Sequence, residues 1–151
     1  MDRLLDRTAT GPLYLGRPEI AGIVVEALDY GAEALRQYEL HAWVIMPNHV
    51  HILITPRVTL SKITKSLKGI TAKRANTVLG FTGTPFWQDE SYDHEVLSDR
   101  EFRRIAAYIA NNPVSAGLAA RPEEFRFSSA GGTGASRADQ GVCPTSSSVR
   151  L

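Results

Sequence analysis

The stretch HAWVIMPNHVHILIT, residues 41–55, decides the fold because it predicts a β-hairpin. The segments YELHAWVIM (38–46) and HVHILIT (49–55) are rich in β-branched and aromatic residues, which favour strands. Pro47 and Asn48 lie between them and are residues that favour turns. We therefore expect two antiparallel strands, joined tightly, to form the first part of a sheet.

Two histidines open the second strand of this hairpin. Residues two apart in a strand face the same side, so His49 and His51 point to one face. Val50, Ile52 and Ile54 fill the other face. Two imidazoles placed in this way form half of a metal site. Two half-buried histidines satisfied by hydrogen bonds are the simpler interpretation, and the pair alone favours it.

The bulk composition is that of a small globular protein. The chain has 151 residues, 43% of them hydrophobic, which indicates one domain with a modest core. Its one cysteine, Cys143, cannot form an intrachain disulfide, which favours a reducing compartment. No apolar run approaches the ~20 residues of a membrane span, and the start lacks a signal peptide's apolar core. We expect a cytoplasmic protein that does not bind membranes.

The net charge of +1 hides an asymmetry along the chain. Residues 41–88 contain no aspartate or glutamate. A segment with one sign of charge attracts anions, with nucleic acid as the leading candidate. A basic helix face that is merely solvated is the alternative. The basic residues of this segment are Arg57, Lys62, Lys65, Lys68, Lys73 and Arg74.

Three helices are predicted by apolar residues at helical spacing, over 17–37, 59–79 and 98–112. Thr59 caps the second, and Ser98 with Glu101 fits a capping box for the third. We expect the third helix to end at Asn112-Pro113, because proline disfavours helical geometry in the preceding residue.

The remaining segments complete the expected organisation of the chain. A short strand is predicted over 94–97. After Ser129 the sequence turns to glycine, serine and threonine, which predicts one domain over 1–129 and a disordered tail over 130–151. The fold class is α+β, an antiparallel sheet with helices packed on it.

A tyrosine and an amide share one face of the last helix. Tyr108 and Asn112 are four residues apart. Two neutral imidazoles, the Asn112 amide oxygen and open water positions suit Mg²⁺ or Mn²⁺. A tyrosine hydroxyl, with a pKa of ~10, is a weak nucleophile, and a metal that polarises a phosphate would lower the barrier to its attack. Spacing alone leaves equally open that Tyr108 borders the core and Asn112 ends the helix.

Several motifs, in order, resemble a known family. MPNHVHILI resembles the HUH motif (His, hydrophobic, His) of single-tyrosine transposases and relaxases. FWQDESYDHEVLSDREFRRIAAYIANNPVSAGLAARPEEFRFSS is similar to the carboxy-terminal half of REP-associated tyrosine transposases, which are bacterial. LKGITAKRAN resembles the lysine-bearing helix between those motifs. The resemblance covers roughly Gly11 to Ser129.

The resemblance implies an enzyme that cuts single-stranded DNA near hairpins such as REP or other palindromic elements, as a monomer or homodimer. His49 and His51 match the metal-binding pair, Tyr108 the nucleophile and Asn112 the third ligand, for Mg²⁺ or Mn²⁺. The tyrosine would form a 5′-phosphotyrosyl bond and release a 3′-hydroxyl. A non-cutting DNA-hairpin-binding protein is the alternative. A histidine-triad hydrolase fits poorly, because Leu53 stands where its third alternating histidine would be.

The resemblance also suggests DNA contacts and a structural gap. Trp87 would stack on unpaired bases, although a tryptophan is more often part of a core. Relatives begin with a strand before the first helix, so we expect a ferredoxin-like HUH fold that lacks its first strand. The unpaired backbone groups of such a sheet edge can pair with another chain and cause aggregation. Phosphates of a folded DNA end would be contacted by Lys62, Lys65, Lys68, Lys73 and Arg74.

Overall fold

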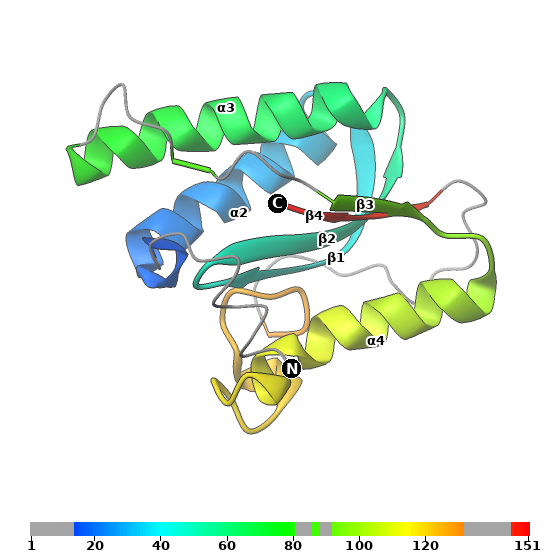
Figure 1. The fold of residues 1–151 in the computed structure, drawn as a ribbon. Helices are drawn as coiled ribbons and strands as arrows, with labels where there is room; N and C mark the ends of the chain where they lie inside the picture. Colours follow the sequence, from blue (N-terminus) through cyan, green and yellow to red (C-terminus); the bar gives the residue numbers. More distant parts are fainter. Residues whose placement is uncertain (1–13, 81–85, 88–91, 132–145) are drawn as a thin grey trace.

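The computed structural model describes residues 14–80, 86–87, 92–131 and 146–151. These residues form three α-helices and one four-stranded antiparallel sheet, which confirms the predicted α+β class. Helices α2 and α3 cover one face of the sheet, and α4 covers the other (Figure 1). In chain order the elements are η1 (Tyr14–Gly16), α2 (Pro18–Glu33), β1 (Tyr38–Met46), β2 (His49–Pro56), α3 (Leu60–Leu79), β3 (Tyr92–Glu95), α4 (Asp99–Ser115), η2 (Pro122–Glu124) and β4 (Ser147–Arg150).

The hairpin predicted from the opening stretch is present. Strands β1 and β2 pair antiparallel from Tyr38 opposite Pro56 to Met46 opposite His49. The other side of β1 is covered, because the Ile45 amide donates to the Phe127 carbonyl at 2.9 Å and Ser128 forms a bridge with Val44. The hairpin is thus fixed on both sides.

The expectation of a disordered tail over 130–151 is wrong for its last residues. Strand β4 lies inside the sheet, whose order is β1-β2-β4-β3. Val149 is opposite Ile52 of β2 and Asp93 of β3, and only 2% of its surface is exposed. The sheet therefore has a strand between β2 and β3. Residues 132–145 lie outside the described part of the chain.

Alternation along β2 divides the core into two clusters. Val50, Ile52 and Ile54 are fully buried against residues of α2 and α3. Leu53, one residue out of phase, packs with Ile109 and other residues of α4. The two faces of one strand thus serve different helix layers. None of the described helices combines the length and apolar character needed to cross a membrane.

Helix α4 runs further than the sequence predicts. It continues past Asn112 to Ser115, with Pro113 inside the helix and buried. A proline near a helix end loses only one backbone hydrogen bond. The Pro113 carbonyl itself accepts from the Leu118 amide at 2.8 Å. The two predicted caps are confirmed, since Thr59 accepts from the Lys62 amide and Ser98 from the Glu101 amide.

Gly31 interrupts the apolar stripe of α2 for a packing reason. The Tyr38 side chain is 1% exposed, and its hydroxyl donates to the Leu28 carbonyl at 2.6 Å. A Cβ atom added at Gly31 would lie 2.5 Å from that hydroxyl oxygen. The glycine therefore makes room for a buried, hydrogen-bonded tyrosine from the next strand.

We expect Gly31→Ala to lower the free energy of unfolding by about 1 to 3 kcal/mol, the usual cost of overpacking a core. Gly22→Ala is the matched control in the same helix, because a Cβ there has nothing within 4 Å. That control should stabilise the helix by up to about 1 kcal/mol. Urea denaturation of both variants measures the difference, and equal effects would contradict the packing role of Gly31.

Candidate active site

The two histidines of β2 face helix α4. His49 is buried and His51 half-buried, and both alternate with the residues that pack against α2 and α3. The His51 ring contacts the Tyr108 ring of α4 edge to face, with centroids 5.8 Å apart. The structure therefore brings together the histidine pair and the predicted nucleophile.

Both imidazoles are held in the neutral form. Burial, followed by the nearby positive charge of Arg150, lowers the pKa of His51 to about 4. Burial, Arg150 and His51 together lower the pKa of His49 to about 3. Because a neutral imidazole is the form that binds a metal, the pair is ready to act as ligands at neutral pH.

Each imidazole has one ring nitrogen in a hydrogen bond. Nδ1 of His49 lies 2.9 Å from Oδ1 of Asn48, and Nε2 of His51 lies 2.6 Å from the Ser148 hydroxyl. Metal-bound histidines almost always donate their other ring N–H in this way. The remaining nitrogens have no hydrogen-bond partner among the described residues, so the pair fits a metal ion.

Tyr108 and Asn112 stand one turn apart on α4. The Tyr108 side chain is 52% exposed, so its hydroxyl is accessible to a polymer such as DNA. Asn112 is partly buried within the helix, and the hydrogen bonds of the two histidines to described side chains go to Asn48 and Ser148 rather than to Asn112. The described residues contain no group of three among His, Cys, Asp and Glu that could hold a metal. The predicted set is not such a group, because its third ligand is the amide oxygen of Asn112 rather than a histidine, cysteine or carboxylate.

Strand β4 contributes two residues that sequence reasoning missed. Ser148 contacts His51, and Arg150 is directly opposite His51 in the ladder. The only local signal was the alternation of apolar Val149 and Leu151 with polar residues, which is too short to identify a strand.

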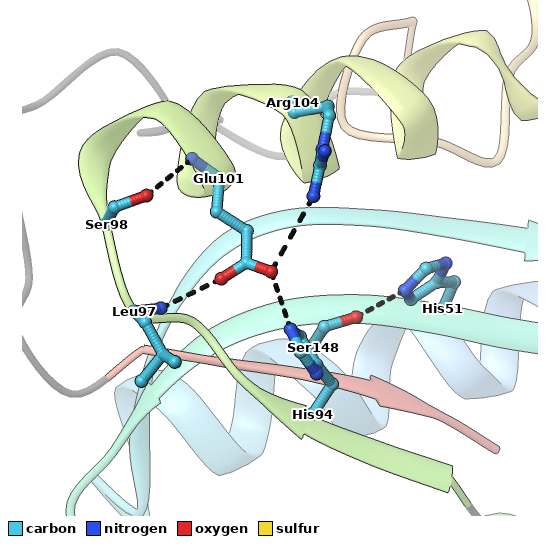
Figure 2. A network of polar contacts seen from close by, with 7 residues as sticks. All are labelled: His51, His94, Leu97, Ser98, Glu101, Arg104 and Ser148. Atoms are coloured by element: carbon cyan, nitrogen blue, oxygen red, sulfur yellow. Dashed lines mark hydrogen bonds and ion pairs between the residues drawn. The ribbon is translucent and has the colours of Figure 1, made fainter.

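His94 belongs to a polar network that joins β3 to the start of α4 (Figure 2). Its Nε2 lies 2.7 Å from Oε2 of Glu101. The same Oε2 lies 3.7 Å from Nη2 of Arg104, and the other oxygen, Oε1, accepts from the Leu97 amide at 2.9 Å. Glu101 thereby connects β3 to the helix that carries Tyr108, and His94 has a structural role in this network.

The predicted DNA-binding residues lie across the sheet from the histidines. Lys62, Lys65 and Lys73 are exposed on α3, whereas Arg74 pairs with Glu26 of α2 at 2.8 Å. A groove of about 710 Å³ beside α3 is lined by residues of α3, β3 and β4 and by Trp87 of the connecting segment. These residues include Lys65, Lys68, Trp87, Asp93 and Val149.

Trp87 is anchored rather than free to move. Its indole N–H donates to the Thr71 hydroxyl at 2.7 Å, and its ring packs against the core cluster of α2 and α3. Part of the side chain still lines the groove. The structure therefore supports a core role for Trp87 at the border of the groove.

Known proteins resemble this chain over the region that holds the site. Residues 25–112, more than half of the chain, match the family described as "Transposase IS200 like". The chain is 26% identical over 93 residues to the REP-associated tyrosine transposase of Escherichia coli (strain K12), covering 62% of this chain and 54% of that relative. It thus spans about half the length of the curated relative it matches. No solved structure gives a significant match. The matched residues include the histidine pair, Tyr108 and Asn112, and the chain belongs to the family of IS200-like transposases.

Proposed function

We propose that the chain is a metal-dependent single-stranded DNA endonuclease and strand transferase that cuts near DNA hairpins. The observation that carries the proposal is the contact between the exposed Tyr108 and the neutral His51. The name of the E. coli relative, a REP-associated tyrosine transposase, supports both a tyrosine nucleophile and a REP-type DNA substrate.

In the proposed reaction, Tyr108 attacks a phosphodiester of single-stranded DNA. Its oxygen forms a bond to phosphorus, and the bond from phosphorus to the 3′-oxygen breaks. The products are a 5′-phosphotyrosyl bond and a free 3′-hydroxyl. Water carries the proton that the tyrosine loses to the leaving 3′-oxygen. The covalent bond keeps the phosphodiester's energy, so a 3′-hydroxyl can later reverse the step without ATP.

His49, His51 and Asn112 would hold Mg²⁺ or Mn²⁺. Such an ion, when bound, polarises the phosphate and stabilises the charge that develops on its oxygens. Burial keeps both histidines neutral, and their second ring nitrogens are oriented by Asn48 and Ser148. Asn112 lies one helical turn from Tyr108, which favours it as the third ligand.

The lysines of α3 would bind the hairpin on the opposite face of the sheet. Strand β3 is the edge between the groove beside α3 and the face that carries His51, since Asp93 lines the groove and His94 contacts α4. A DNA strand leaving a hairpin at Lys65 and Lys68 would thus pass around β3 to reach Tyr108. Binding and cutting would use separate surfaces.

A covalent-adduct assay tests the proposal. Purified protein is mixed with Mn²⁺ and a labelled single-stranded oligonucleotide that carries a hairpin from beside its gene, then run on a denaturing gel. We expect a shifted band that disappears with EDTA and in Tyr108→Phe. Tyr30→Phe is the matched control, because Tyr30 has the same 52% exposure on α2.

Two results would contradict the proposal in different ways. A band that persists in Tyr108→Phe would show that another group is the nucleophile. No band from the wild-type chain, with hairpin binding in a native gel that survives both EDTA and Tyr108→Phe, would favour a non-cutting DNA-hairpin-binding protein.

A further inference from the structure

Strand β4 places a cation beside the histidine pair. Arg150 is opposite His51 on one side and Tyr92 on the other. Directly opposite residues in an antiparallel ladder point to the same face. The guanidinium therefore extends on the face of the sheet that α4 covers, which is also the face of Tyr108.

The positive charge of Arg150 is close to both imidazoles. It contributes to the lowered pKa of His49 and to that of His51. A cation in this position opposes the binding of a second cation, so it disfavours a metal ion that arrives alone. It favours an anion at the same place.

Arg150 has no acidic partner within 4 Å among the described residues. On the same face, the Glu101 carboxylate of α4 is engaged by His94 and Arg104. The arginine is half-buried, and a partly buried charge without a counter-ion is unfavourable. A bound anion would supply the missing counter-ion.

We infer that Arg150 binds the phosphate that Tyr108 attacks, so that β4 supplies the anion-binding group of the site. The inference rests on the proposed function. A guanidinium can contact two phosphate oxygens at once, which holds the phosphate in one orientation between the tyrosine and the histidines. The bound phosphate would also offset the repulsion between Arg150 and a divalent ion, so phosphate and metal would bind cooperatively.

The test compares Arg150→Ala, Arg150→Lys and the wild-type chain, with Arg121→Ala as control. Arg121 is an exposed arginine paired with Glu124 at η2. Binding of Mn²⁺ is followed by electron paramagnetic resonance with and without inorganic phosphate. We expect phosphate to strengthen Mn²⁺ binding severalfold in the wild type and in Arg121→Ala, and not in Arg150→Ala. Without phosphate, Arg150→Ala should bind Mn²⁺ as well as the wild type or better.

The covalent-adduct rate gives the second readout. Arg150→Ala should form the adduct roughly a hundredfold more slowly, which is the usual effect of removing one group that stabilises charge in a transition state. Arg150→Lys should recover part of this loss, because it keeps the charge without the planar fork. Arg121→Ala should react at the wild-type rate.

Three results would overturn the inference. The first is a wild-type adduct rate in Arg150→Ala. The second is phosphate enhancement of Mn²⁺ binding that survives in that variant. The third is an Arg150→Ala variant that binds Mn²⁺ more weakly than the wild type in the absence of phosphate and also forms the adduct more slowly. That result would indicate a structural role for Arg150. A wild-type chain that forms no adduct contradicts the proposed function instead, and the phosphate titration then still tests Arg150.

Discussion

Replacing His51 with alanine is expected to slow covalent-adduct formation by roughly a thousandfold or more. A metal that polarises a phosphate supplies several kcal/mol of transition-state stabilisation, and each ~1.4 kcal/mol is tenfold in rate. His51 also contacts Tyr108 directly, with ring centroids 5.8 Å apart, so the variant loses the proposed ligand that touches the proposed nucleophile. The adduct rate and the Mn²⁺ affinity are measured on the same preparation, and both should fall.

His94→Ala is the control for this prediction. His94 lies on the edge strand β3, which β4 separates from β2, and its exposed side chain pairs with Glu101 rather than with the histidines of β2. We expect its adduct rate to stay within about tenfold of wild type, since an exposed ion pair contributes at most ~1 kcal/mol. If His51→Ala lost no more than His94→Ala, the histidine pair would not be the metal site.

Replacing Val149 with aspartate is expected to lower the free energy of unfolding by about 3 to 5 kcal/mol, because it buries an unpaired charge at the centre of the sheet. Val149 is 2% exposed, belongs to the core of α2 and α3, and lies between Ile52 and Asp93. The aspartate would also stand opposite an existing carboxylate. Urea denaturation measures the loss.

The control is Val78→Asp on α3, where the side chain is 51% exposed. It should cost no more than about 1 kcal/mol. Should Val149→Asp be too unstable to purify, Val149→Ala provides a milder test, with an expected loss of roughly 2 kcal/mol. Equal effects at positions 149 and 78 would show that β4 does not occupy the centre of the sheet.

Local patterns were sufficient to predict most of the fold. The hairpin, the faces of β2 and the starts of α3 and α4 follow from alternation, helical spacing and caps, which depend on neighbours in sequence. The predicted end of α4, at Asn112, was three residues too early. Burial of Pro113 outweighs the tendency of a proline to end a helix. The predicted third strand began two residues late, at His94 rather than Tyr92.

Strand β4 could not be predicted in the same way. Its four residues, three of them polar, have little intrinsic preference, and their stability comes from partners more than fifty residues away in the chain. The same limit applied to the site. Spacing indicated His49, His51, Tyr108 and Asn112, whereas Ser148 and Arg150 come close to the histidines only through that long-range pairing. Equally, spacing gave no sign that the lysines of α3 lie across the sheet from Tyr108.

The position of β4 also constrains how the chain folds. On a ribosome, residues 51–54 and 92–95 are made well before residues 147–150, which must lie between them. Among the described residues the sheet partner of β3 is β4, so this pairing waits until residues 147–150 are synthesised. Pairing across such long separations is slow, because a large loop must close first. The hairpin of β1 and β2 can form early with α2 and α3, while assembly of the face proposed to cut DNA waits for β4.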